Sequence, residues 1–176
     1  MEIDPEIVAR RARERADENW GFRTFLKAYS KLPERRVDAL AEQFARQAEA
    51  QINCTTCAAC CRDNYIPVNN QEIARLAKRL NLTPGEFASR YVQPETSEHD
   101  AGIDARPCPF LEDNLCSVYE DRPEVCQGYP YIGGNIASRT VGIIERAGTC
   151  PIIFDMLERL KDELGYNYYR RGRRRR

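Results

Sequence analysis

The residues with the clearest chemistry in this sequence are its eight cysteines. Thiolates spaced two residues apart in a short loop can bind one metal, because the loop brings their sulfurs within the ~2.3 Å bonds that zinc forms. A packed apolar core has no need of cysteine at this density. We therefore predict that all eight are metal ligands, four of them clustered and four dispersed: Cys54, Cys57, Cys60 and Cys61, then Cys108, Cys116, Cys126 and Cys150.

Whether these thiols form disulfides or bind metal depends on the redox state of the cellular compartment. The first five residues, Met1 to Pro5, contain no apolar core of a secretory signal, and no apolar run approaches the ~20 residues of a membrane span. We expect a cytoplasmic protein without a membrane association. Disulfides rarely persist in a reducing compartment, so the cysteines favour metal binding or redox chemistry. Four disulfides remain the alternative, because the number of cysteines is even.

Ligation by sulfur alone is compatible with both zinc and an iron–sulfur cluster. His99, the only histidine, lies in a polar loop and is expected to be a surface residue. Side chains of adjacent residues such as Cys60 and Cys61 usually diverge, so the thiols either divide into two four-cysteine zinc sites or hold one cubane plus a remainder. The run Cys54-x2-Cys57-x2-Cys60 is similar to a bacterial ferredoxin motif, although Cys61 departs from its spacing. We expect an iron–sulfur cluster of the 4Fe–4S type ahead of zinc.

Charge is distributed unevenly along the chain. The formal net charge is zero, but six arginines lie between Arg170 and Arg176, and removing them leaves 21 basic residues against 27 acidic ones. A run of arginines can bind nucleic acid by releasing condensed counterions. No aromatic and basic residues interleave on a recognisable binding fold elsewhere. We favour a solvated tail over nucleic-acid binding, and we expect an unidentified protein partner.

The elements that must position the thiols are mainly helical. Apolar periodicity predicts a helical segment from Asp4 to Tyr29, either one helix or two divided at Gly21, and a second helical segment after Pro33 that ends at the cysteine loop. We expect these two helices to form an antiparallel hairpin. A final helix is predicted over residues 152–164, with Ile153, Met156, Leu157 and Leu160 on one face.

Shorter elements follow the cysteine cluster. Residues 65–68 are extended, and two capping boxes, Asn69 with Glu72 and Thr83 with Glu86, begin two helices. A tight turn at residues 112–114 predicts a small hairpin that displays Cys108 and Cys116, and a capped helical turn delivers Cys126. Residues 141–144 are predicted to form a strand. The fold class is thus α+β and mainly helical, with a hairpin over residues 1–52, a cysteine-cluster domain over 53–165 and a basic tail over 166–176.

The ordered cysteine motifs resemble a known family. The blocks Cys54-x2-Cys57-x2-Cys60-Cys61, Pro107-Cys108-Pro109-Phe110-Leu111 and Cys116-x2-Tyr119-x2-Arg122-Pro123-x2-Cys126 are similar to the YkgJ-type CxxCxxCC cysteine-cluster family. The resemblance covers roughly residues 54–151 and implies a domain that chelates zinc or iron. A related arrangement occurs in flagellin lysine N-methylase, which involves an iron–sulfur cluster and S-adenosylmethionine. No nucleotide-binding loop is recognisable in this chain.

These observations lead to three functional hypotheses. The first is an iron–sulfur protein that acts in electron transfer or as an accessory to a modifying enzyme. The second is an enzyme that uses S-adenosylmethionine or redox chemistry at the cluster. The third is an interaction module that zinc holds in shape. Side chains near the cysteines, which either donate hydrogen bonds to sulfur or pack in the core, are Tyr65, Tyr119, Arg122 and Tyr129.

Overall fold

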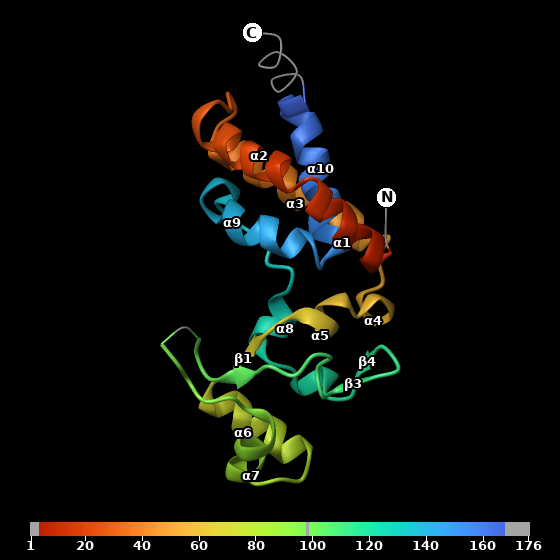
Figure 1. Cartoon of the computed structure of the whole chain (residues 1–176), viewed down its shortest axis with the longest axis vertical. Coiled ribbons are helices and arrows are strands. Elements are labelled where there is room, and N and C mark those ends of the chain that lie inside the picture. Colours follow the sequence, from red (N-terminus) through yellow and green to blue (C-terminus); the bar gives the residue numbers. More distant parts are fainter. Residues whose placement is uncertain (1–3, 98, 168–176) are drawn as a thin grey trace. The chain divides into compact units, whose positions relative to one another are not determined.

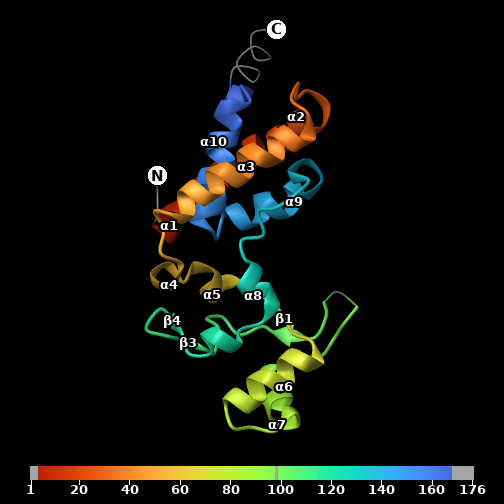
Figure 2. The same cartoon turned by 180° about the vertical axis from the view of Figure 1, so that it is seen from behind.

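The computed structural model describes residues 4–97 and 99–167. The chain divides into two compact units, one formed by residues 1–57 and 130–176 and the other by Ala58–Tyr129. The first unit is helical, and the second combines short helices with short strands, which confirms the mainly helical α+β class (Figures 1 and 2). Among the described residues, every helix is too short or too polar to cross a membrane. The domain boundaries predicted at residues 52 and 165 stay predictions, and the arginine run lies outside the described residues.

The first unit consists of helices that come from both ends of the sequence. Asp4 caps the first helix, as predicted, because its Oδ1 accepts hydrogen bonds from the backbone N–H groups of Glu6 at 2.9 Å and Ile7 at 3.2 Å. The helices of this unit are α1 (Pro5–Glu14), α2 (Ala16–Ala28), α3 (Glu34–Glu49), α4 (Cys54–Cys57), α9 (Ile136–Ala147) and α10 (Pro151–Glu163).

The N-terminal segment forms two helices, which is one of the two predicted outcomes, but the break lies at Arg15 and not at Gly21. Arg15 has φ −103° and ψ 13°, which ends α1 and begins α2. Gly21 lies inside α2, where a Cβ atom would collide with the hydroxyl of Tyr166. The glycine therefore admits a close neighbour from the C-terminal part of the chain, and the helix continues through it.

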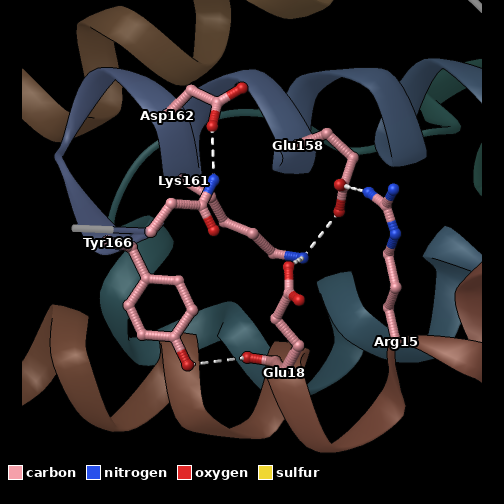
Figure 3. Close-up of polar contacts among 7 residues, drawn as sticks. Arg15, Glu18, Glu158, Lys161, Asp162 and Tyr166 are labelled. Carbon is pink, nitrogen blue, oxygen red and sulfur yellow. Dashed lines mark hydrogen bonds and ion pairs between the residues drawn. The ribbon is translucent and has the colours of Figure 1, made fainter. Parts of the chain in front are cut away.

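A buried ion-pair network fixes α10 against α2 (Figure 3). The side chain of Lys161 is 1% exposed, and its Nζ donates to Glu18 at 3.1 Å and to Glu158 at 2.6 Å. Arg15 pairs with Glu158, and the hydroxyl of Tyr166 donates to the backbone carbonyl of Glu18 at 3.1 Å. A buried ammonium group is tolerated only when it is paired and hydrogen-bonded. Sequence patterns gave no sign of this network.

Residues 141–144 form part of α9, so the strand predicted there was wrong. The β-branched residues in this stretch favour a strand locally. Asp38 of α3 stabilises a helix here instead. Its two carboxylate oxygens accept hydrogen bonds from the N–H groups of Asn135 at 2.9 Å and Ile136 at 2.8 Å, at the start of α9. The buried residues Ile136, Thr140, Ile143, Ile144 and Ala147 then share one face.

The second unit contains shorter elements around a small core. β1 (Ile66–Pro67) pairs antiparallel with β2 (Gly102–Ile103), and β3 (Leu111–Glu112) pairs antiparallel with β4 (Leu115–Cys116). Asp113 and Asn114 make the turn of the predicted hairpin, with φ 46° and 68°. The helices of this unit are α5 (Ala59–Asp63), α6 (Asn70–Arg79), α7 (Pro84–Tyr91), η1 (Tyr119–Asp121) and α8 (Glu124–Gly128).

Both predicted capping boxes are present in the second unit. Asn69 and Glu72 cap α6, and Thr83 and Glu86 cap α7. Helices α6 and α7, the strand β2 and the segment before β3 bury one apolar cluster between them. Its buried members are Ile66, Val68, Ile73, Leu76, Ala77, Phe87, Ile103, Cys108, Phe110 and Val118.

Candidate metal centre

The cysteine cluster folds as two short helical turns and not as the loop that the sequence predicts. Asn53 begins the first turn, because its Oδ1 accepts the N–H of Thr55 at 3.0 Å and its carbonyl accepts the N–H of Cys57 at 3.0 Å. Ala58 then adopts the left-handed region, with φ 48°. The second turn, α5, follows at once and carries Cys60 and Cys61. The boundary between the two units falls between Cys57 and Ala58.

Four thiols of the second unit gather from four segments. The backbone N–H of Cys108 donates to the carbonyl of Cys61 at 2.7 Å, which joins α5 to the segment before β3. Cys116 lies on β4 opposite Leu111 of β3. Cys126 lies on α8. All four cysteines belong to the apolar cluster or pack against it. We call Cys61, Cys108, Cys116 and Cys126 the four-thiol group.

Burial raises the pKa of three of these thiols. The pKa of Cys108 rises to about 11 and that of Cys126 to about 12, chiefly because burial disfavours the charged form. The pKa of Cys116 is raised for the same reason. Negative charge on the other members raises all three further, so these sulfurs lie within electrostatic reach of one another. A bound cation would remove that repulsion and hold the thiolate forms.

Cys61 behaves differently from its neighbours. A hydrogen bond from Cys60 and the charge of Arg62 lower the pKa of Cys61 to about 7, against the opposing effect of burial. At neutral pH about half of this thiol is therefore the thiolate, the form that binds metal.

Glu72 and Arg75 position Cys126, a role that the sequence did not reveal for either residue. Glu72 is 6% exposed, and its two oxygens accept the N–H of Asn69 at 2.8 Å and the N–H of Glu124, at the start of α8, at 2.8 Å. Arg75 donates to the carbonyls of Asp121 at 3.1 Å and Arg122 at 3.2 Å. Helix α6 thus holds the segment that carries Cys126. The capping box identified Glu72 but not its second partner.

Arg122 lies beside the thiols, as the sequence indicated. Its guanidinium lies 3.7 Å from the centroid of the Tyr119 ring and donates to the Tyr119 carbonyl at 2.8 Å. Its positive charge lowers the pKa of Cys116 and Cys126, against the larger effect of burial. His99 packs instead on the ring of Tyr65, with centroids 5.5 Å apart. Its contacts are those of an exposed loop residue.

The remaining three thiols lie in the first unit. Cys54 is exposed, Cys57 is half-buried, and both belong to α4, whereas Cys150 is buried at the N-terminus of α10. Burial raises the pKa of Cys150 to about 11, and the charges of Cys54 and Cys57 raise it further. The sequence-predicted ligands are thus distributed over both units, and the full set of eight stays a prediction.

The donor chemistry fits a thiophilic metal, although the thiols do not form a finished coordination shell. Among the described residues, no three Cys, His, Asp or Glu side chains are close enough together to bind one ion as they stand. The four-thiol group supplies only sulfur donors, which zinc and iron–sulfur clusters both accept. Electrostatic reach and shared packing define the group, and metal binding would have to draw the sulfurs closer together.

Comparison with known proteins identifies the cysteine-bearing region. A family model described as "CxxCxxCC: Putative zinc- or iron-chelating domain" matches residues 53–151, which are 99 of the 176 residues. All eight cysteines lie inside the matched region. A search of solved structures found no match.

Proposed function

The chain belongs to the CxxCxxCC family of zinc- or iron-chelating cysteine-rich domains, and from this premise we propose that it is an iron–sulfur protein. The four-thiol group, Cys61, Cys108, Cys116 and Cys126, would hold the cluster. One observation supports this assignment: four sulfurs from four segments gather on one apolar cluster. Iron–sulfur clusters are ordinarily held by four cysteine thiolates.

The protein contributes hydrogen bonds and charge around these sulfurs. The backbone N–H groups of Phe110 and Val118 hydrogen-bond to the thiols of Cys108 and Cys116 and lower their pKa. Arg122 adds a positive charge beside Cys116 and Cys126. A bound cluster would supply one-electron redox chemistry, and hydrogen bonds, charge and burial at its sulfurs set the reduction potential. We propose that the site acts in electron transfer or that the protein is an accessory to a modifying enzyme.

A structural zinc site is the second candidate, and the short elements of the second unit favour it. Each strand there has two residues, and α5 and α8 have five each. Elements this short gain little stability of their own, and a closed four-cysteine zinc site contributes folding free energy directly. In that case the thiols hold the fold, and the chemistry lies elsewhere.

Purification without oxygen separates the two candidates. We expect a brown protein with about four iron and about four acid-labile sulfide per chain, and a visible spectrum that bleaches on reduction. The double variant C108S/C126S should lose both iron and sulfide. A colourless wild-type protein that contains zinc and no sulfide would exclude the cluster and establish the zinc site in its place.

A further inference from the structure

We propose that the chain associates with a second copy of itself, through a basic apolar surface of the first unit and an acidic apolar surface of the second. The first surface surrounds the connection between α2 and α3, and we call it the basic tip: Lys27, Tyr29, Lys31, Leu32, Arg35 and Arg36. The second surface lies on and after the turn between β3 and β4, and we call it the acidic hairpin: Glu112, Asp113, Leu115, Tyr119, Glu120 and Glu124. The inference does not depend on which metal the thiols bind.

Exposed apolar side chains gather at these two surfaces. Within the described part of the chain, the exposed large hydrophobic side chains are 41% to 56% exposed, and they are Trp20, Tyr29, Leu32, Leu115 and Tyr119. Two belong to the basic tip and two to the acidic hairpin. Trp20 lies about two helical turns before Lys27, on the same stripe of α2. Exposed apolar groups rimmed by polar residues mark interaction sites, whereas single scattered ones are common.

The fold leaves the positive charge of the basic tip without a counter-charge. The connection between α2 and α3 projects at one end of the helices of the first unit (Figures 1 and 2). Glu34 is the only carboxylate between residues 27 and 36, and Asp38 is occupied by two backbone N–H groups at the start of α9. Four cations of the tip are exposed and make no ion pair or side-chain hydrogen bond with the described residues: Lys27, Lys31, Arg35 and Arg36.

The acidic hairpin presents the opposite charge around a similar apolar centre. Glu112 and Leu115 are direct cross-strand partners, so their side chains lie on the same face of the two-stranded sheet. The other pair, Leu111 and Cys116, packs against the apolar cluster, which leaves Glu112 and Leu115 exposed to solvent. Four carboxylates here are also exposed and form no ion pair with the described residues: Glu112, Asp113, Glu120 and Glu124.

The two surfaces complement each other. Arg122, the only basic residue between residues 112 and 124, stacks on the ring of Tyr119, so the acidic hairpin keeps a net negative charge. The whole chain has a formal net charge of zero, and general repulsion between copies is therefore weak. Opposite charges steer the encounter, and apolar side chains at the centre of each surface leave water on contact. Because the basic tip of one copy meets the acidic hairpin of another, the contact is heterologous.

Charge reversal in matched variants tests this contact. Full-length holoprotein, purified without oxygen and kept in a reductant that prevents disulfides between copies, is analysed by sedimentation equilibrium at low ionic strength. We expect the wild type to associate as its concentration rises. The dissociation constant should increase roughly tenfold or more in K31E/R35E and in E112K/E120K, because attraction becomes repulsion. An equimolar mixture of these two variants should associate again, since the reversed tip of one meets the reversed hairpin of the other.

Two controls separate the contact from general charge effects. The variant R13E/K78E carries the same change in net charge as K31E/R35E at other exposed positions, and it should associate like the wild type. Association of the wild type should weaken as ionic strength rises from about 0.01 M to about 1 M, because the Debye length falls from ~30 Å to ~3 Å. Metal content and far-UV circular dichroism should be the same in all variants, which shows that each one folds.

Three outcomes would overturn the proposal. The first is a wild type that stays monomeric at low ionic strength. The second is a mixture of K31E/R35E and E112K/E120K that does not regain association. The third is loss of association in a chain that lacks residues 170–176 while K31E/R35E still associates, which would assign the positive charge to the arginine run. A monomeric wild type that binds anionic lipid vesicles, when K31E/R35E does not, would assign the basic tip to a membrane surface instead.

Discussion

The two units of the chain hold their thiols in place by different means. Apart from α4, the helices of the first unit have 10 to 16 residues. Its thiols lie on the short turn α4 and at the N-terminus of α10, where only Cys150 is buried. The second unit contains strands of only two residues, and there four of the five thiols belong to the apolar core or pack against it. We infer that metal is accessory to the fold of the first unit and part of the fold of the second.

Removing metal should therefore affect the units unequally, and this is the largest effect that we expect. Zinc bound by cysteines contributes about 10 kcal/mol or more to folding in small domains. After chelation, backbone amides in residues 108–128 should lose their protection from hydrogen exchange, whereas those of α3 and α10 should keep it. Hydrogen exchange with mass spectrometry checks this. Equal loss of protection in both units would show that the two units do not differ in their dependence on metal.

Metal affinity at the four-thiol group should rise steeply with pH. Cys108 and Cys126, with pKa values of about 11 and about 12, and Cys116, whose pKa is also raised, are protonated at neutral pH, and Cys61 is half protonated. Binding one ion releases roughly three to four protons, so affinity increases roughly a thousandfold per pH unit near neutrality. Zinc competition with a chromophoric chelator measures the slope. A change below tenfold would show that fewer thiols bind.

Breaking the ion-pair network should destabilise the first unit alone. Glu18→Gln removes one of the two carboxylates that pair with the buried ammonium of Lys161, at a cost of about 2–4 kcal/mol. Thermal unfolding measures the loss, and metal content at the four-thiol group should not change. The control Glu14→Gln alters an exposed pair with Arg10 and should be silent. Loss of metal from the four-thiol group in Glu18→Gln would contradict the independence of the units.

Cys60 should tune its neighbour Cys61 in the apoprotein. Cys60→Ala removes the hydrogen bond that lowers the pKa of Cys61 to about 7 from the ordinary 9.0. The thiolate fraction at neutral pH, and with it the alkylation rate of Cys61, should fall by up to ~50-fold. Peptide mapping after brief iodoacetamide treatment across the pH range measures the midpoint. Cys60→Ser keeps a donor and should retain a low midpoint, whereas equal midpoints in all three proteins would exclude the hydrogen bond as the cause.

The smallest expected effect compares two capping boxes in the second unit. Glu72→Ala removes a cap and also the acceptor that holds the start of α8, at a cost of about 1–3 kcal/mol. Glu86→Ala removes a cap alone, on the exposed surface, and should cost less than Glu72→Ala. Only Glu72→Ala should speed the loss of metal from the four-thiol group to a chelator. Equal rates would show that Glu72 does not position Cys126.

Much of the local structure could be predicted from the sequence, because the signals were local. The caps at Asp4, Asn69 and Thr83 each rest on residues within one helical turn. The strand predicted over residues 141–144 failed because Asp38, far away in the chain, caps the helix that replaces it. The burial of Lys161 could not be predicted for the same reason, since its partner Glu18 comes from the opposite end of the sequence.

The candidate site shows the same division between local and distant information. Spacing alone predicted that the cysteines form a metal-binding set, and the matched family region contains all of them. Spacing could not group them, because vicinal Cys60 and Cys61 fit several partitions. The backbone bond between Cys61 and Cys108 and the packing of Cys116 and Cys126 on one apolar cluster supply that grouping. Both depend on contacts between segments that are distant in the sequence.

The buried network around Lys161 also restricts the order in which its members can be replaced during evolution. Loss of Glu18 first deprives a cation that is 1% exposed of one carboxylate partner. Loss of Lys161 first, to methionine, leaves two carboxylates that are 17% and 21% exposed, one of which still pairs with Arg15. The second intermediate costs less because water reaches both charges. Lineages that abandon the network should therefore change position 161 before positions 18 and 158.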